Sequence, residues 1–351
     1  MEPVSVVIDG TKFEHWQSVT VTRSVDTFST VTLTAPFDPS RKEFREVFRP
    51  FSFKPLKVLI KGKALFTGSL VGVHPRIDPN ARTVEVTGYS LPGVLQDCTA
   101  PGKTVPHEFK KLGLRAIIEQ LCQPFGLAVK IGPGSSEGSR FDKVKLEEGQ
   151  VLFEFFTELA KQRNLVISDT AEGAVLCWRS VEAGNPVGIF VEGEAPLSTV
   201  SAEFNPQDYF SEITGFCSAK RGRKGSKHTE QNPWLTRLRP MSFKLDDTEK
   251  GDAPEATRAK LGRMFANVAA YTLSDLPTWR DPNGDLWEPN TTLKLTAPSV
   301  MIYRRTELLV RNVTLVQDAD KETATLDLVL PGAFSGEPPG LTSFLPWEEP
   351  I

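Results

Sequence analysis

Cysteine is scarce in this chain, with four among 351 residues. Neighbouring cysteines are separated by 24, 55 and 40 positions, and no two of them form a CxxC pair. This spacing offers neither a zinc pattern nor a disulfide framework, and it favours folding in a reducing compartment. Cys122 and Cys177 fall at apolar positions of an expected helix and an expected strand, so we expect both thiols to be buried and inert.

Long apolar runs and a strong charge of either sign are also missing. No run approaches the roughly 18 residues that span a bilayer, and the start of the chain lacks the regions of a signal peptide, so we expect no membrane insertion. The formal net charge is −3, which gives no global attraction to nucleic acid. With 39% hydrophobic residues, the chain is long enough for two or three domains with their own cores.

Recognisable catalytic motifs are absent from the sequence. It contains no HExxH motif, no GxSxG elbow and no Walker loop, and Gly132-Pro133-Gly134 lacks the Lys-Ser/Thr of a phosphate-binding loop. The four histidines are scattered over unrelated contexts and are predicted to be surface or turn residues: His15, His74, His107 and His228. We therefore assign no catalytic, cofactor-binding or metal-binding residue and expect a protein that is not an enzyme.

Two acidic patterns are candidate sites. Asp281, Asn283 and Asp285 alternate like calcium ligands, but Leu286 stands where the calcium loop needs glycine and Thr292 where it needs glutamate. Glu147-Glu148 precedes an expected helix, whose positive end suits acidic residues better than general acid-base catalysis does. A structural role is therefore the better interpretation of both.

Lys220–His228 is the best candidate for contact with nucleic acid, because it holds five lysines and arginines. It has no interleaved aromatic residue on which bases could stack. An exposed loop, or one that docks on an acidic partner, is the favoured interpretation.

The clearest fold signal is a β-rich unit over Tyr271–Phe334. Asn283-Gly284 predicts a tight turn with positive φ at both residues, flanked by Trp279 and Trp287. Three strand-like runs follow at Thr292–Thr296, Glu307–Val316 and Thr323–Leu330. Their alternation of apolar and polar residues is typical of strands with one buried face.

A similar hairpin occurs near the start of the chain. Phe66 aligns with Leu308, and the same offset of 242 residues places Val84 on Leu326. The loops between the two strands then have equal lengths, which predicts an internal structural repeat. Because the hypothesis requires two modules, a single large barrel, or one sheet holding both hairpins, would remove this argument for a repeat.

Between the two β-rich regions the pattern becomes helical. Leu112–Cys122 and a second segment that begins at Leu152 repeat apolar residues at helical spacing, and a third helix is predicted around Leu261–Val268. The predicted fold class is α+β, mostly β, with two similar small β-barrel domains flanking a small α+β domain. The predicted domains are 1–98 (first barrel), 99–181 (α+β), 182–335 (second barrel with an inserted loop and helix) and 336–351 (Pro-rich tail).

Several stretches carry a family resemblance, the most specific being Trp279-Arg280-Asp281 with Gly284–Asn290. The others are Val6–Gly10 with Trp16–Arg23, Gly88-Tyr89-Ser90 leading to Leu95–Cys98, Ile117–Gly126, and Glu148-Gly149-Gln150. With these, nearly the whole chain resembles the baseplate hub (tail) proteins of Mu-type contractile-tailed bacteriophages, the gene-D-like tail proteins. The Lys220–His228 stretch and the Pro-rich tail depart from the family, so family contacts made by those parts are not carried over.

The resemblance implies a structural homotrimer with two barrels per protomer. Six barrels in a ring would match a hexameric tail tube on one side and a trimeric central spike on the other, with DNA passing through a central channel during ejection. The implied partners are the tail tube protein, the central spike protein, baseplate wedge proteins and the tape-measure protein. The implied location is the virion tail baseplate, after synthesis in the host bacterial cytoplasm.

Two alternatives remain open at this stage. One is the hub of a related contractile injection system, such as a pyocin-type or secretion spike. The other is a hub with peptidoglycan-hydrolase activity in which Glu154 or Glu158 acts as the acid, although both are expected on the polar face of a helix, away from any cleft. No cofactor is implied by either.

Overall fold

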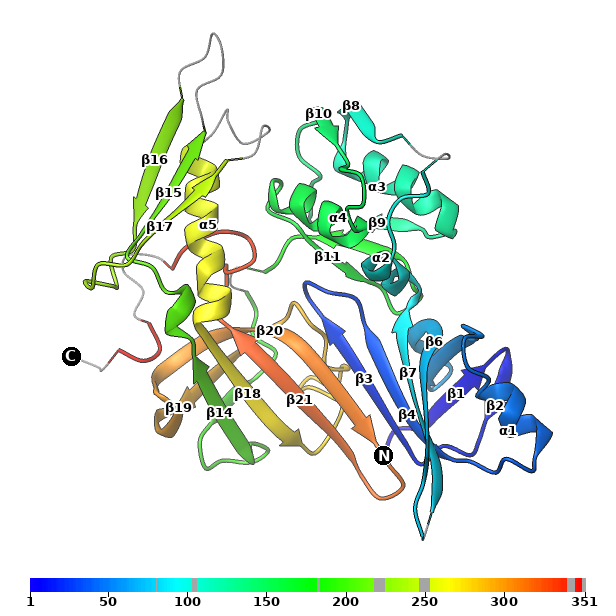
Figure 1. Cartoon of the computed structure of the whole chain (residues 1–351). Coiled ribbons are helices and arrows are strands. Elements are labelled where there is room, and N and C mark those ends of the chain that lie inside the picture. Colours follow the sequence, from blue (N-terminus) through cyan, green and yellow to red (C-terminus); the bar gives the residue numbers. More distant parts are fainter. Residues whose placement is uncertain are drawn as a thin grey trace.

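One large sheet dominates the computed structural model, which describes residues 1–79, 81–102, 106–181, 184–217, 225–245, 253–339 and 345–348. Thirteen strands belong to it, in the order β14-β18-β21-β20-β3-β4-β7-β6-β5-β1-β2, with β19 beside β20 and β13 beside β19 (Figure 1). The strands are β1 (Val4–Ile8), β2 (Thr11–Phe13), β3 (Ser18–Ser24), β4 (Thr30–Pro36), β5 (Pro55–Ile60), β6 (Lys63–Ile77), β7 (Arg82–Ser90), β13 (Ile189–Val191), β14 (Thr199–Phe204), β18 (Ala269–Leu276), β19 (Thr292–Ala297), β20 (Ile302–Gln317) and β21 (Glu322–Val329).

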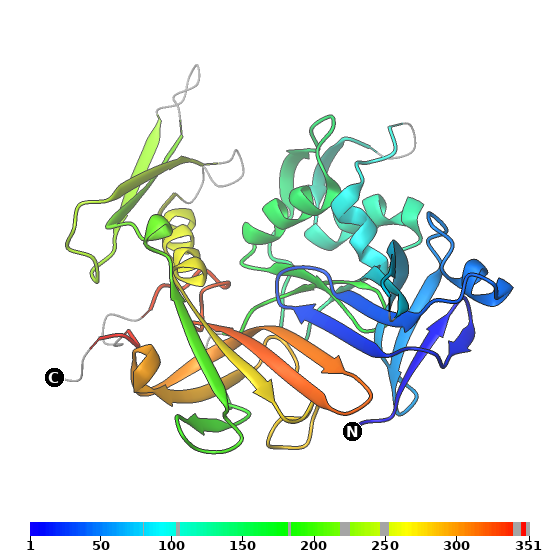
Figure 2. The same ribbon diagram turned by 60° about the horizontal axis from the view of Figure 1, so that its bottom comes forward.

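The two β-rich regions are joined edge to edge instead of forming separate barrels. Strand β3 pairs antiparallel with β20 from Val19 opposite Gln317 to Ser24 opposite Asn312. The pairing path ends at β14 and at β2, so within the described residues the sheet is curved but open (Figure 2). A mostly β fold is therefore confirmed, whereas the description as two closed barrels is not. A single hydrophobic core runs under both halves.

Both hairpins lie in one sheet, so the expectation that a repeat requires separate sheets is wrong; the strand pairing itself shows the repeat. The first module has the order β3-β4-β7-β6-β5, and the second has the order β14-β18-β21-β20-β19. Both central hairpins carry an irregularity at the same place, between Leu70 and Gly72 in the first and between Val310 and Asn312 in the second. The outer strands differ, because β1 pairs antiparallel with β5 whereas β13 pairs parallel with β19.

The predicted alignment of the two hairpins is wrong by two residues. Leu70 pairs with Gly88, and Val310 pairs with Leu328, so counterparts are 240 residues apart and not 242. Val86, not Val84, is the counterpart of Leu326. A shift of two residues keeps every side chain on its face of the sheet, so the apolar pattern alone cannot detect it.

The segment after β7 forms a small α+β domain with its own core (Figure 1). The predicted amphipathic helices are α3 (Leu114–Cys122) and α4 (Leu152–Lys161), which bury the apolar positions that defined them. Cys122 and Cys177 are buried, as predicted, and burial raises the pKa of each thiol to about 12. The remaining elements are η1 (Leu91–Gly93), α2 (Val94–Asp97), β8 (Glu108–Leu112), η2 (Gln123–Phe125), β9 (Val129–Ile131), β10 (Phe141–Lys145), β11 (Val166–Asp169) and β12 (Val175–Trp178).

An arm of three strands and a long helix is inserted between β14 and β18, where the first module has only the β3–β4 loop. The strands are β15 (Glu212–Cys217), β16 (Ser226–Gln231) and β17 (Pro240–Lys244), and the helix is α5 (Ala253–Val268). In both ribbon views the three strands of the arm lie beside α5 and stand away from the large sheet (Figures 1 and 2). Three short helical elements complete the described part of the chain: α1 (Lys42–Val47), η3 (Pro206–Asp208) and η5 (Pro298–Val300).

Part of the tail packs on the second module. Leu345 is buried in the main core, and the N–H of Tyr303 donates to the carbonyl of Pro346 at 3.3 Å. Gly336 lies against α5, since a Cβ added to Gly262 would stand 2.4 Å from its carbonyl carbon. The described part of the tail therefore covers its own chain.

Candidate assembly surfaces and the interdomain cleft

The seam between β3 and β20 is the structural centre of the molecule. On one face, Val19 and Val21 of β3 and Val313 and Leu315 of β20 are fully buried. On the other face, the hydroxyls of Thr22 and Thr314 lie 3.2 Å apart. The β-branched residues that predicted half-buried strands thus fit a seam with one dry and one polar face.

The N-terminus closes one end of this seam through charged groups. Arg280 Nε donates to Glu2 Oε1 at 2.6 Å, and Lys61 Nζ lies 3.2 Å from Glu2 Oε2. The hydrogen bond from Arg280 has the largest effect on Glu2 and, together with Lys61, outweighs the opposing effect of burial. These partners hold the pKa of Glu2 at about 2, so its carboxylate stays ionised well into the acid range.

Arg280 belongs to the stretch that carried the strongest family resemblance. Trp279 is buried, and its Nε1 donates to the carbonyls of Val316 and Thr323 at 3.1 and 3.0 Å. The Trp279–Trp287 loop therefore holds the β20–β21 hairpin through hydrogen bonds to both of its strands. Its position beside Glu2 explains why this stretch combines tryptophan with arginine.

The turn within this stretch differs from the prediction. Gly284 has a φ of +89°, but Asn283 does not have a positive φ. The N–H of Gly284 bonds to the carbonyl of Asp281, so Pro282 and Asn283 are the central residues, as suits a proline with φ fixed near −65°. Asp281 Oδ1 accepts the N–H groups of Asn283 and Asp285 at 2.9 and 3.0 Å, which gives this carboxylate a structural role.

The α+β domain docks on the loop between β3 and β4. Phe28 of that loop is buried in the core of the α+β domain. Asp169 Oδ1 accepts the N–H and the hydroxyl of Ser29 at 2.8 and 2.9 Å, and Trp178 Nε1 donates to the carbonyl of Val25 at 2.9 Å. Burial raises the pKa of Asp169 despite the hydrogen bonds from Ser29. Sequence reasoning missed this contact, because an isolated Asp at the end of a strand has no pattern.

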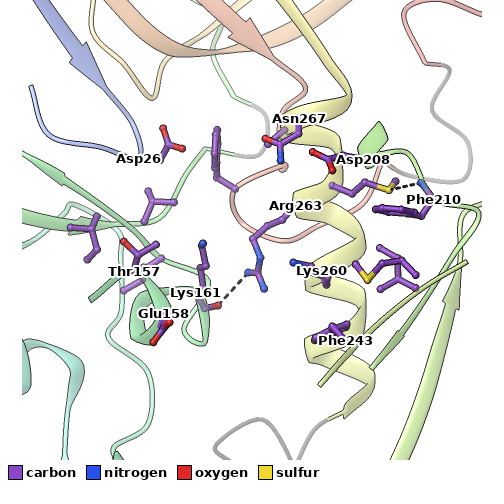
Figure 3. A pocket seen from close by; sticks show the side chains of 18 of the residues that line it. Asp26, Thr157, Glu158, Lys161, Asp208, Phe210, Phe243, Lys260, Arg263 and Asn267 are labelled. Carbon is purple, nitrogen blue, oxygen red and sulfur yellow. Dashed lines mark hydrogen bonds between the residues drawn. The ribbon is translucent and has the colours of Figure 1, made fainter. Parts of the chain in front are cut away.

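A cleft of about 700 Å³ lies between the α+β domain and the arm (Figure 3). From α5, Lys260 and Arg263 extend into the cleft toward Lys161 at the end of α4, and Arg263 Nη1 donates to the Lys161 carbonyl at 3.3 Å. Burial, with smaller contributions from Arg263 and Lys260, lowers the pKa of Lys161. Arg311 also lines the cleft and pairs with Asp26 at 3.0 Å.

Glu158 lines this cleft, contrary to the expectation that it lies away from one. Its Oε2 accepts a hydrogen bond from Gln150 Nε2 at 2.9 Å, whereas the exposed Glu154 does not line the cleft. A glycosidase needs two carboxyl groups facing each other across the bond that is cut. The other carboxylates of the cleft are Asp208 and Asp26, and Asp26 is paired with Arg311.

The remaining sequence candidates are dispersed. His15 and His74 are exposed, His107 lies in the α+β domain, and His228 Nε2 lies 2.8 Å from Glu230 Oε1 on β16. The prediction that Lys220–His228 is a loop is wrong at its C-terminal end, because Lys227 and His228 belong to β16. Residues 220–224 lie outside the described residues. In the part of the chain that the structure describes, no three His, Cys, Asp or Glu residues gather as a metal site.

Comparison with known proteins defines the class. Residues 92–179 match the family model described as the second domain of gp44-like baseplate hub proteins. The chain is 26% identical over 341 residues to baseplate hub protein gp44 of Escherichia phage Mu, covering 92% of this chain and 87% of that protein.

Solved structures share the fold across almost the whole chain. The prophage MuSo2 43 kDa tail protein from Shewanella oneidensis superposes with a TM-score of 0.80 at 20% identity, covering 95% of this chain and 99% of that one. A tail protein from Neisseria meningitidis gives 0.78 at 17% identity, with 95% and 98% coverage. An Escherichia coli type VI secretion component described as similar to T4 tail proteins gp27 and gp5 gives 0.52 at 10% identity, with 92% and 75% coverage.

The fold is shared with phage tail proteins. More particularly, the chain is similar over nearly its whole length to the gp44-like baseplate hub proteins of Mu-type phages, which confirms the family resemblance seen in the sequence. No helix within the described residues is both long enough and apolar enough to cross a bilayer.

Proposed function

We propose that three copies of this hub protein form a ring in which two similar β-modules per chain imitate sixfold geometry. The observation that carries this proposal is the strand-by-strand correspondence of β3-β4-β7-β6-β5 with β14-β18-β21-β20-β19. Two equivalent modules in each of three subunits present six similar faces, whereas the rest of the chain, present once per subunit, keeps threefold symmetry. A ring of this kind fits between a sixfold and a threefold structure.

In the assembled tail, the sixfold face would contact the tail tube protein and the threefold face the central spike protein. Baseplate wedge proteins and the tape-measure protein are the further partners we expect, and DNA would pass through the central channel during ejection. The α+β domain and the arm occur once per chain, so they would decorate the ring as threefold features. Synthesis in the host cytoplasm agrees with three described cysteines that form no disulfide.

Mass measurement in solution over a range of concentrations tests the ring directly. We expect a trimer of the 38.8 kDa chain, and end-on electron micrographs with six similar lobes around a channel. A particle that stays monomeric at every concentration, or a ring with an even number of subunits, would contradict the proposal.

A hub for a related injection machine is the second candidate. The fold shared with the type VI secretion component favours it, although a TM-score of 0.52 at 10% identity concerns the fold alone. Neighbouring genes separate the two cases: genes for capsid beside those for sheath and tube indicate a phage, and sheath and tube genes without a capsid indicate an injection machine.

We propose further that the protein is not an enzyme. Support comes from the cleft, where Glu158 stands among the basic residues Lys161 and Lys260 and where Asp26 is paired with Arg311. A zymogram on purified protein is expected to show no clearing of peptidoglycan. Clearing that disappears in Glu158→Gln but persists in Glu154→Gln would contradict this.

A further inference from the structure

Two strand edges are unpaired within the described residues, although the equivalent edge in the other module is paired with a neighbouring strand. In the second module, β19 covers β20 over residues 302–309, and β3 covers the same edge over residues 312–317. In the first module, β5 covers β6 only as far as Ser69. The counterpart edge of β6, residues 72–77, has no strand on it within the described residues.

The strand equivalent to β3 is also open. Val19 of β3 lies opposite Leu33 of β4, and Val200 of β14 lies opposite Leu273 of β18. Since Leu33 and Leu273 are counterparts, β14 takes the place of β3 in the second module. It forms one end of the sheet, and among the described residues only its β18 edge is paired. Within the described structure, the chain therefore uses one of its two module junctions internally and leaves both halves of the other unpaired.

We infer that β14 of one protomer pairs antiparallel with residues 72–77 of β6 in the next protomer, reproducing the β3–β20 seam between chains. The inference rests on the proposed ring and specifies the contact that builds it. Transferring the internal register gives Phe204 opposite Val73, Ala202 opposite Pro75 and Val200 opposite Ile77. A contact between different surfaces of identical chains runs head to tail, as a closed ring requires.

Hydrogen-bond directions agree with this register. The Asp78 N–H bonds to the Ala81 carbonyl, so even-numbered residues near the end of β6 bond to β7 and odd-numbered ones face the open edge. The Asn205 N–H bonds to the Val268 carbonyl, so even-numbered residues of β14 face outward. The transferred register places these outward-facing residues opposite each other.

Side chains on the two strands are complementary in this register. One face would combine Phe204, Ala202 and Val200 with Val73 and Ile77, and all of them are apolar. Ile77 is 73% exposed in the single chain, and Phe204 is 38% exposed beside Trp347. Covering exposed apolar area of this kind favours association.

The opposite face would be polar, with an acidic side chain on one strand facing basic side chains on the other. Glu203 would stand opposite His74 and diagonally from Arg76, and all three side chains are exposed in the single chain. Opposite charges across a strand pair stabilise it, whereas a slip by one residue would place apolar side chains on the wet face. The two faces together specify one register.

Pro75 has a defined effect on this contact. It lacks an N–H, so the Ala202 carbonyl opposite it would gain no backbone bond. Proline is tolerated on sheet edges, where it also discourages indiscriminate pairing. The junction would therefore have fewer hydrogen bonds than the internal seam and depend more on its apolar face, which suits a contact made after each chain has folded.

Disulfide trapping tests the register in the full-length chain. Ser201 and Arg76 would face each other at a position without backbone hydrogen bonds, where strand neighbours come close enough for a disulfide. In a background carrying Cys98→Ser and Cys217→Ser, Ser201→Cys with Arg76→Cys is expected to give covalent dimers and trimers on oxidation. Each single substitution is expected to give none, and Ser201→Cys with His74→Cys, slipped by two residues, far less.

Mixing two singly substituted chains of different length shows that the bond is head to tail, since only the mixed dimer is expected. A trimer that forms no disulfide in the matched pair would overturn the strand junction and leave the proposed ring intact. A chain that remains monomeric at every concentration and forms no disulfide would overturn both.

A surface substitution provides a second readout that does not depend on oxidation. Ile77→Asp changes an exposed side chain, so the monomer should keep its melting temperature while the trimer dissociates at concentrations at least about tenfold higher. Leu238→Asp is the matched control, because Leu238 is 79% exposed and belongs to neither of the two strands. Equal association of the Ile77→Asp variant and the unsubstituted protein would count against the junction.

Discussion

At the residue scale, Glu2 connects the start of the chain to both modules. Its carboxylate contacts Lys61 after β5 and Arg280 in the Trp279–Trp287 loop, and only 12% of its side chain is exposed. Gln317 Nε2 donates to its backbone carbonyl at 2.9 Å. A residue at an unconstrained terminus would fray, so this set of contacts fixes the N-terminal segment beside the seam.

The Glu2 contacts predict a specific acid sensitivity. Because the folded-state pKa is lowered from 4.5 to about 2, this carboxylate stabilises the fold above pH 4.5, and the contribution is lost as pH falls from there toward 2. We expect Glu2→Gln to be less stable than the unsubstituted protein at pH 7 and equal to it near pH 2. Urea titrations across this range measure the difference, and a difference that does not change with pH would contradict the assignment.

Gly68 illustrates a second constraint at single-residue scale. A Cβ at this position would lie 2.0 Å from the Tyr89 carbonyl oxygen, within the β6–β7 ladder. Gly68→Ala must therefore push two paired strands apart, and we expect a loss of about 1–3 kcal/mol in unfolding free energy. Gly102→Ala is the control, since a Cβ added to Gly102 would have no atom within 4 Å. Equal denaturation midpoints for the two variants would show that the ladder adapts.

At the scale of elements, the β3–β4 loop has two functions. Its backbone reverses the direction of the chain between β3 and β4. The side chain of Phe28 in this loop packs in the core of the α+β domain, where its ring centroid lies 4.8 Å from that of Phe153. Asp169 and Trp178 then hold the same loop by hydrogen bonds. The corresponding position in the second module carries the arm instead, so the two modules differ mainly in what is built on this loop.

We predict that Phe28→Ala destabilises the protein by about 3–5 kcal/mol, because it leaves a cavity between two domains. Differential scanning calorimetry measures this loss of stability, and we expect the α+β domain of the variant to unfold at a lower temperature. Phe51→Ala serves as the control, because Phe51 is 89% exposed and its loss leaves no cavity. A loss below about 1 kcal/mol for Phe28→Ala would mean that the domain docks without this side chain.

For the whole molecule, the continuous core implies that neither module is complete alone. The buried side chains Val19 and Val21 of β3 lie next to Val313 and Leu315 of β20. Residues 1–98 without β20 would expose this apolar edge. Such an edge is a template for pairing with other chains.

We therefore expect a fragment of residues 1–98 to aggregate or to form dimers through β3, whereas the full chain stays soluble as separate rings. Size-exclusion chromatography of the two proteins at equal concentration provides the comparison. A fragment that elutes as a stable folded monomer would show that β3 does not need its partner.

Much of the local structure could be predicted from the sequence. The helices α3 and α4 followed from the spacing of their apolar residues. The hairpin repeat was visible as a pattern, but its offset was wrong by two, since alternation repeats every two residues. The β8–β10 pair was missed, because its strands are short and rich in lysine.

The sequence by itself determined the element types, the existence of two similar hairpins and the family, because these depend on local periodicity and on motifs of adjacent residues. Only the tertiary structure decided that the two modules share one sheet, that Glu158 borders a cleft and that Asp169 holds a distant loop. Each of these depends on contacts between residues far apart in the chain, and such contacts leave no periodic signal. The open edges of β6 and β14 were also revealed only by the tertiary structure. Whether a strand edge is open depends on which strands pair with it, and the local sequence does not show this.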